Sequence, residues 1–176
     1  MRIGVLGYGI GNVGSVKKLC SKFHETKVLG KRDDWEDFSL IIFPGVGSFD
    51  QAMQAVNSSN FLLEYQKLKK RGGLLLGICI GMQVLCKGSE EGEMEGLGLI
   101  DARLTKLLPK PGRPVPHMGW DSVSTIHFPF SADGDYYFTH SYSILENCFK
   151  EEGVGRLIVD YGNRLIAGFS KANIVG

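Results

Sequence analysis

The chain has 176 residues, which is enough for one domain with a full hydrophobic core and too few for two of ordinary size. Its 20 basic and 19 acidic side chains give a formal net charge of +1, which argues against a nucleic-acid or membrane-surface partner. The start shows no secretory signal, and no apolar run approaches the ~20 residues of a membrane helix. Because the four cysteines show no paired spacing, we expect a cytoplasmic protein whose cysteines are thiols.

The first half of the chain alternates between predicted strands and helices. Short apolar runs indicate buried strands over residues 2–6, 27–29, 40–43 and 74–76. Helical spacing of apolar residues predicts helices over 12–23 and 61–71, and a third helix is expected from the residues after Cys79 through Cys86. Strands and helices that alternate in this way are typical of a parallel sheet with both faces covered.

The second half is richer in strands and poorer in helices. Strands are expected over residues 99–107, 135–143, 154–161 and 165–170. No repeat, low-complexity tract or linker separates the two halves. The sequence therefore predicts a single α/β domain over 1–176, in which helices flank a mostly parallel central sheet and the second half is rich in β-structure.

A first cluster of glycines, "GYGIGNVG", follows the first strand. Gly9, Gly11 and Gly14 have the G-x-G-x-x-G spacing of dinucleotide-binding loops, and the strand, turn and helix around them fit as well. The only acidic residues about 20 positions further on are Asp33 and Asp34, which come after the short second strand. We favour an ordinary tight turn and keep a dinucleotide-binding domain as the alternative.

The stretch "GGLLLGICIGMQVLC" places Cys79 at a sharp strand-to-helix corner. A nucleophile elbow needs small residues two positions before and after its reactive residue, and Gly77 and Gly81 occupy those positions. The amide of Ile80 would then be placed to stabilise an oxyanion, and the following helix would favour the thiolate. Most cysteines of this kind are buried and inert, but the surrounding pattern favours a reactive one.

A second glycine-rich turn, "FPGVGSF", also follows a strand. The carboxyl ends of neighbouring parallel strands share one edge of the sheet, where ligands bind. The flexible backbone of Gly45, Val46 and Gly47 could therefore lie beside Cys79 and donate a second amide to an oxyanion. An ordinary strand-to-helix turn explains the same residues equally well.

Five segments together resemble the class I glutamine amidotransferases: "PGVGSFDQAM", "GICIGMQVL", "EGLGLI", "VPHMGWD" and "YYFTHSY". More narrowly, they are similar to the glutaminase subunit of imidazole glycerol phosphate synthase, an enzyme of histidine biosynthesis. The resemblance runs in order along the whole chain, and "PHMGW" with "HSY" is its most specific part. It implies a flavodoxin-like amidotransferase fold.

The resemblance also implies roles for individual residues. Cys79 would attack the side-chain amide of glutamine, release ammonia and form a glutamyl thioester that water hydrolyses. Val46 or Gly47 would form the oxyanion hole together with Ile80. The residues that would hold the amino-acid part of glutamine are Gln83, Ser141 and Tyr142.

The family implies a protein partner for this chain. Ammonia would pass through a tunnel to a (β/α)₈ cyclase subunit with which the chain would form a heterodimer. By resemblance, Gly11, Asn12 and Trp120 would face that partner. The resemblance implies no cofactor and no metal, and we expect neither a nucleic-acid nor a membrane partner.

The match departs from the family where the catalytic histidine and glutamate are expected. Their "HPE" motif follows the family's last strand, and this sequence stops at "ANIVG" just before it. The chain has four histidines, and none of them precedes a Pro-Glu pair. They are His24, His117, His127 and His140. We interpret His117 as a structural or interface residue and do not expect His140 to act as the base. The expectation is a chain incomplete at its carboxyl end, without its last strand and catalytic tail and inactive as it stands, because a thiol needs a general base.

Two other functions fit the same motifs. Paralogues of this subunit supply ammonia for the amidination of surface sugars, with the same chemistry and a different acceptor. A non-catalytic partner subunit would fit the absence of the histidine and glutamate. A second departure, Gly7 in place of the family's usual aspartate, concerns only the loop that would face the partner.

Overall fold

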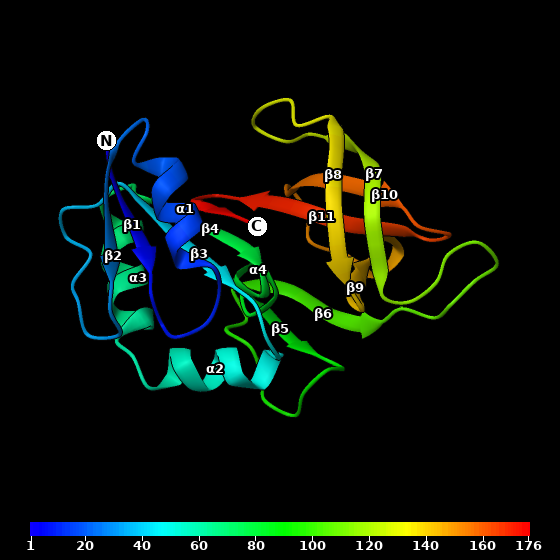
Figure 1. The fold of residues 1–176 in the computed structure, drawn as a ribbon, viewed down its shortest axis with the longest axis horizontal. Coiled ribbons are helices and arrows are strands. Elements are labelled where there is room, and N and C mark those ends of the chain that lie inside the picture. Colours follow the sequence, from blue (N-terminus) through cyan, green and yellow to red (C-terminus); the bar gives the residue numbers. More distant parts are fainter. The chain divides into compact units, whose positions relative to one another are not determined.

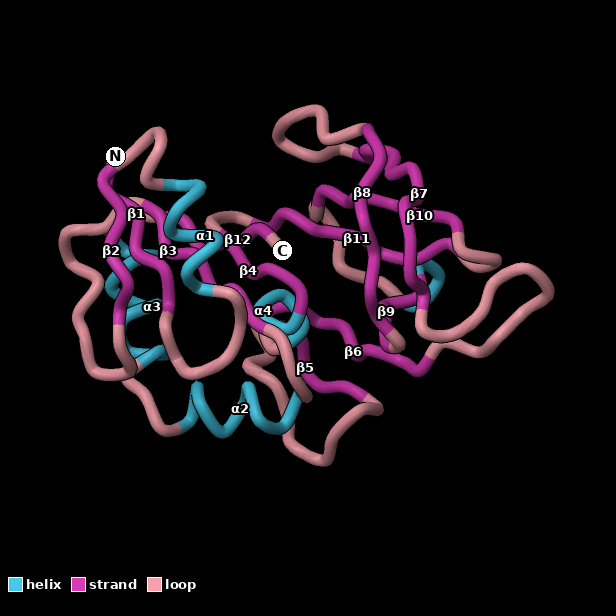
Figure 2. Tube along the Cα trace, in the orientation of Figure 1, coloured by secondary structure: helices cyan, strands magenta, loops and turns pink.

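A parallel sheet with the spatial order β2-β1-β3-β4-β12 forms the framework of the first of two compact units (Figure 1 and Figure 2). The computed structural model describes residues 1–176, and they divide into unit 1 (1–85 with 172–176) and unit 2 (86–171). This is the 2-1-3-4-5 order of flavodoxin-like folds, with β12 as the fifth strand. The strands of unit 1 are β1 (Arg2–Leu6), β2 (Glu25–Leu29), β3 (Leu40–Gly45), β4 (Leu74–Cys79) and β12 (Ile174–Val175).

Helices lie on both faces of this sheet (Figure 1). On one face, Val13 and Val16 of α1 (Val13–Cys20) pack against Ile3, Val5 and Ile42. On the other, Phe61, at the start of α3 (Phe61–Lys70), lies with its ring centroid 5.5 Å from that of Phe43. The remaining helices of unit 1 are α2 (Phe49–Asn57) and α4 (Ile80–Gln83).

The α1 face is covered less completely than the opposite face. No residue of α1 is fully buried, whereas α2 and α3 each bury several apolar side chains. The parallel register aligns Leu74 with Leu40 and Ile78 with Pro44, so both β4 side chains belong to the α1 face. They remain 45% and 41% exposed. The apolar core of unit 1 is therefore concentrated on the side of Phe43, Phe49 and Phe61.

The regular elements of unit 2 are strands, apart from one 3₁₀ turn, and loops connect them, as the colouring of Figure 2 shows. Its sheet runs in the spatial order β8-β7-β10-β11-β9-β6-β5, antiparallel except for the parallel pair β5 and β6. Leu107, Val123, Val159 and Leu165 form a core cluster in this unit. Its elements are β5 (Cys86–Ser89), β6 (Ile100–Lys106), β7 (His117–Ile126), β8 (Gly134–His140), β9 (Tyr142–Leu145), the 3₁₀ turn η1 (Glu146–Cys148), β10 (Gly155–Asp160) and β11 (Arg164–Lys171).

The predicted fold class is confirmed, since helices flank a mostly parallel sheet and the second half of the chain is β-rich. The expected helix from Cys79 through Cys86 is wrong in its length. α4 ends at Gln83, and Cys86 begins β5 because it pairs with Ile100 in the next strand. The sequence also gave no indication of β7, where polar residues and Gly119 interrupt the apolar alternation. The single-domain organisation stays a prediction.

No helix of the structure has the length and apolar composition to cross a membrane.

Candidate active site

Cys79 occupies a sharp, strained corner at the end of β4. Its backbone angles are φ 55° and ψ −117°, and its side chain is exposed. A residue other than glycine reaches such a conformation at a cost of about 1–3 kcal/mol, which the surrounding structure must supply. Strain of this kind at a strand-to-helix turn is the signature of a nucleophile elbow, which lifts its reactive atom clear of the sheet.

Two glycines make the corner possible, as the sequence predicted. A Cβ atom on Gly77 would lie 2.6 Å from the carbonyl oxygen of Gly81. A Cβ atom on Gly81 would lie 1.8 Å from the carbonyl oxygen of Phe43. Both clashes are with main-chain atoms, which no change of side-chain rotamer relieves. The glycines two positions before and after Cys79 are therefore required by the close approach of β3, β4 and α4.

The helix that follows Cys79 is shorter than expected. α4 contains 4 residues, and Cys79 is its N-cap residue. A single turn carries only a fraction of the dipole of a longer helix. Stabilisation of the thiolate form of Cys79 therefore comes mainly from nearby backbone N–H groups. One of them belongs to Ile80, the residue that follows the cysteine.

The glycine-rich turn after β3 lies at the same edge of the sheet as Cys79. Gly45 is aligned with Cys79 in the parallel register of β3 and β4. A Cβ atom on Gly45 would lie 1.9 Å from Cγ2 of Ile80 and 3.3 Å from the amide nitrogen of Gly81, so the start of α4 packs directly against Gly45. Gly47, with φ at 117°, needs the freedom of glycine, and Val46 is exposed. The main chain over 45–47 is therefore adjacent to the elbow.

The loop after β1 reaches the same place. Gly11 has φ at 90°, and a Cβ atom on it would lie 2.9 Å from Cα of Gly45. Asn12 caps α1, since its side chain accepts a hydrogen bond from the amide of Ser15 at 3.2 Å. A turn and a close backbone approach account for the conformations of Gly9 and Gly11 without a bound dinucleotide.

The predicted substrate-binding residues are divided between the two units. Gln83 ends α4 and is buried, 7% exposed, which is uncommon for an amide side chain. Ser141 and Tyr142 belong to unit 2, where Ser141 is the single residue between β8 and β9. The structure describes each unit by itself, so these three residues stay predictions as one binding site.

Trp120 lies on an exposed apolar surface of β7 and β8. It is 70% exposed, and its ring centroid lies 5.7 Å from that of Tyr137 on the neighbouring strand. Met118, two residues before Trp120, is also exposed. Large apolar side chains gathered on a strand pair are a common feature of protein-binding surfaces.

Sequence reasoning missed a group of polar side chains in unit 2. His117 and His140 are aligned on β7 and β8, and their ring nitrogens Nδ1 and Nε2 lie 2.9 Å apart. The other ring nitrogen of His117 lies 2.9 Å from Oδ2 of Asp121. Residues four apart in a strand lie on one face, so the spacing of His117 and Asp121 could have indicated that they are neighbours. This was not recognised because β7 itself was not predicted.

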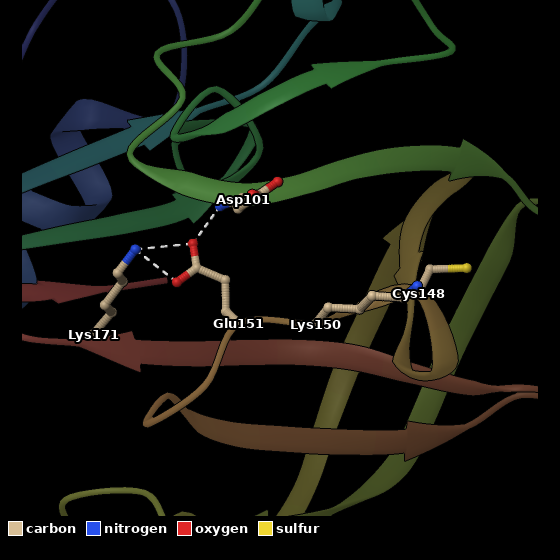
Figure 3. Close-up of a pocket in the computed structure, with 5 residues that line it drawn as sticks. All are labelled: Asp101, Cys148, Lys150, Glu151 and Lys171. Atoms are coloured by element: carbon tan, nitrogen blue, oxygen red, sulfur yellow. Dashed lines mark hydrogen bonds and ion pairs between the residues drawn. The ribbon is translucent and has the colours of Figure 1, made fainter.

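A cavity of about 420 Å³ lies in unit 2 and contains none of the predicted site residues (Figure 3). Its lining residues are Asp101, Cys148, Lys150, Glu151 and Lys171. The carboxylate of Glu151 accepts hydrogen bonds from Lys171 Nζ, at 2.9 and 2.6 Å, and from the amide of Asp101. Glu151 therefore binds groups of the protein itself, and these contacts fasten β6 to β11.

The elbow in a flavodoxin-like sheet agrees with the comparison of the sequence with known families. Residues 12–110 match the CobB/CobQ-like glutamine amidotransferase domain. The chain belongs to the glutamine amidotransferases. The predicted resemblance to the class I enzymes is thereby confirmed.

Among these proteins, the relatives carry a more particular name. The imidazole glycerol phosphate synthase subunit HisH of Prochlorococcus marinus (strain MIT 9211) is 34% identical in an alignment of 149 positions that covers 81% of this chain and 70% of that protein. The HisH 2 subunit of Methanococcus maripaludis is 32% identical over 181 residues, with coverage of 99% and 88%.

Solved structures support the fold. The PurLQS structure from Thermotoga maritima superposes with a TM-score of 0.71 at 21% identity, over 99% of this chain and 84% of that one. A crystal structure of a glutamine amidotransferase gives a TM-score of 0.72 at 19% identity, over 98% and 86%. At these identities the likeness concerns the fold alone.

Proposed function

We propose that this chain hydrolyses glutamine and supplies ammonia to a (β/α)₈ cyclase subunit that makes imidazole glycerol phosphate in histidine biosynthesis. The observation that carries the proposal is the strained elbow at Cys79, with Gly77 and Gly81 around it and the 45–47 turn beside it. The names of the HisH relatives supply the pathway. A cytoplasmic location and a heterodimer with the cyclase are parts of the same proposal.

The chemistry follows from a thiolate at the elbow. In the family a histidine–glutamate pair, which residues 1–176 do not contain, takes the proton from the thiol, so the proposal concerns the chain working together with that pair. The sulfur of Cys79 attacks the side-chain carbonyl carbon of glutamine, and the negative charge moves to the oxygen. Amides of Ile80 and of Val46 or Gly47 stabilise that oxyanion. The carbon–nitrogen bond then breaks, and the base returns the proton that it took from the thiol to the leaving nitrogen, which departs as ammonia while a thioester remains. Water hydrolyses the thioester to glutamate and restores the thiol.

The remaining predicted residues bind the substrate or the partner. Gln83, Ser141 and Tyr142 hold the amino-acid part of glutamine. Gly11 and Asn12, in the loop after β1, contact the cyclase together with Trp120. The exposure of Trp120 supports a contact with a partner. Transfer of ammonia inside a complex keeps it from becoming ammonium, which is a poor nucleophile.

The proposal is tested on the protein in complex with its cyclase. Cys79→Ala should abolish synthesis from glutamine and leave synthesis from ammonium salts at the level of the unmodified complex. Cys148→Ala is the matched control, because Cys148 is also an exposed cysteine but lies outside the elbow. A diazoketone analogue of glutamine should add to Cys79 and not to Cys148, as measured by the masses of proteolytic fragments.

Equal loss of both syntheses in Cys79→Ala would show that the cysteine is structural and not a nucleophile. Glutamine hydrolysis that feeds no cyclase product, while a sugar acceptor is amidinated, would replace histidine biosynthesis by the surface-sugar alternative. Binding of the cyclase without reaction at Cys79 would identify a non-catalytic partner subunit.

A further inference from the structure

A chain of three hydrogen bonds crosses unit 2 from a carboxylate to the peptide group of Tyr142. Oδ2 of Asp121 lies 2.9 Å from Nε2 of His117, and Nδ1 of His117 lies 2.9 Å from Nε2 of His140. Nδ1 of His140 lies 3.0 Å from the carbonyl oxygen of Tyr142. The last bond spans Ser141 and closes a ring that contains the peptide groups on both sides of that residue; the carbonyl oxygen of Ser141 also accepts from the amide of Leu107 at 2.8 Å.

The rings of this chain are held firmly in place. His117 is fully buried, stacked between Tyr161 with centroids 3.7 Å apart and Phe138 at 4.6 Å. His140 is half-buried and aligned with His117 across β7 and β8. Because each histidine uses one ring nitrogen on the other, the pair does not converge on a metal ion. No group of three or more His, Cys, Asp and Glu side chains in the structure does so.

Counting protons shows what the chain requires. Both ends are acceptors, a carboxylate oxygen at Asp121 and a carbonyl oxygen at Tyr142, so all three hydrogen bonds must take their protons from the two rings. Three bonds need three protons, whereas two neutral imidazoles carry only two. A neutral pair therefore leaves one bond without a proton. Because a carboxylate and a neutral imidazole nitrogen are both stronger acceptors than a peptide carbonyl, that bond is the one between His140 and Tyr142.

We propose that Asp121, His117 and His140 are positioning residues for the segment Ser141–Tyr142, and that they hold it fully only when the histidine pair carries one extra proton. The inference rests on the proposed function, in which Ser141 and Tyr142 hold glutamine. With the extra proton, Nδ1 of His140 donates to the carbonyl oxygen of Tyr142 and closes the ring around Ser141, in addition to the bond that Ser141 accepts from Leu107. Without it, two lone pairs face each other and the segment loosens.

The charged and titratable groups around the pair set the pH at which this happens. Burial lowers the pKa of His117, and the hydrogen bond with Asp121 opposes that change. Burial also lowers the pKa of His140. Arg113, whose guanidinium lies 3.6 Å from Oδ1 of Asp121 and 5.0 Å from the ring centre of Tyr161, disfavours a further positive charge. The pair thus holds the extra proton at acidic pH. As the pH rises, it releases that proton before the pH reaches 6.5, the ordinary pKa of histidine.

The variant Asp121→Asn separates proton sharing from simple packing. An asparagine amide can donate to Nε2 of His117, so two neutral rings then suffice for a complete chain that ends on Tyr142. The matched control is Asp135→Asn, the same change on the neighbouring strand, where Asp135 accepts from Ser122 at 2.6 Å and does not contact the histidines.

The experiment combines nitrogen-15 NMR of the imidazoles with glutamine binding measured by calorimetry. Both are recorded as a function of pH in a Cys79→Ala background, where glutamine binds without turnover. We expect His117 and His140 to titrate together, with Nδ1 of His140 protonated only on the acidic side. The affinity for glutamine should fall roughly two- to tenfold as the proton is lost, which is the worth of one hydrogen bond. Asp121→Asn should remove both dependences, and Asp135→Asn should keep them.

Other results would overturn the proposal. If Nδ1 of His140 keeps its proton throughout, or if Asp121→Asn titrates like the parent, the pair does not share an extra proton. If the spectra agree but the affinity for glutamine does not change with pH, the positioning role is wrong. If no glutamine binds at any pH, both the proposed function and the positioning role fail, while the spectra still decide whether the proton is shared.

Discussion

The substitution Gly81→Ala tests whether the elbow depends on main-chain contact. The added Cβ atom would lie 1.8 Å from the carbonyl oxygen and 2.8 Å from the carbonyl carbon of Phe43. Contacts of a Cβ atom below 3.0 Å are essentially never seen, so β3 and α4 must separate by more than 1 Å. Overpacking of this kind costs about 1–3 kcal/mol. Displacement of Cys79 by the same amount should slow its reaction by roughly a hundredfold.

The control is Gly14→Ala, which adds the same atom to α1, where nothing lies within 4 Å of the new Cβ. There the change should stabilise the helix by about 0.5–1 kcal/mol. The free energy of unfolding is measured by urea denaturation followed by circular dichroism. The reactivity of Cys79 is measured as the rate of alkylation by the diazoketone. If Gly81→Ala were as stable and as reactive as Gly14→Ala, the close packing would not be what shapes the elbow.

Two further predictions concern buried polar groups. Glu64, 2% exposed, accepts from the amide of Trp35 at 2.9 Å, so Glu64→Ala should lower the free energy of unfolding by about 1–3 kcal/mol and Glu64→Gln by less, in urea denaturation. Burial raises the pKa of Cys86 from 9.0 to about 12, so the folded state keeps a proton that the unfolded state loses in this range. Its contribution to stability should be complete below pH 9.0 and lost as the pH rises toward 12. Cys86→Ala should lack this loss, and equal pH dependence in both proteins would contradict the prediction.

The elbow could be predicted from sequence because its physical causes are local. A cysteine flanked by Gly77 and Gly81 after an apolar run leaves few other interpretations, and the structure shows the clash that each glycine avoids. The neighbouring turn at Gly45 could be placed beside it because parallel strands end at one edge. Both inferences need only the chain direction and the size of a Cβ atom.

The parts that the sequence did not reveal depend on pairing between distant segments. Cys86 continues a helical pattern locally, but its pairing with Ile100 makes it the start of a strand. His117 and His140 are 23 residues apart and meet only because β7 and β8 align them. The strand β7 contains polar residues at half of its positions, so its apolar alternation is too weak to recognise.

The contacts among Gly11, Gly45, Gly77 and Gly81 determine how heat should affect this region. Main chain packs on main chain there, and main chain has no rotamers through which to adjust gradually. Small changes in the surrounding core therefore leave the elbow as it is, until the strands themselves separate. The loss of Cys79 reactivity on heating should coincide with the melting of β3 and β4. Below that temperature, Cys79 should keep its full reactivity toward the diazoketone.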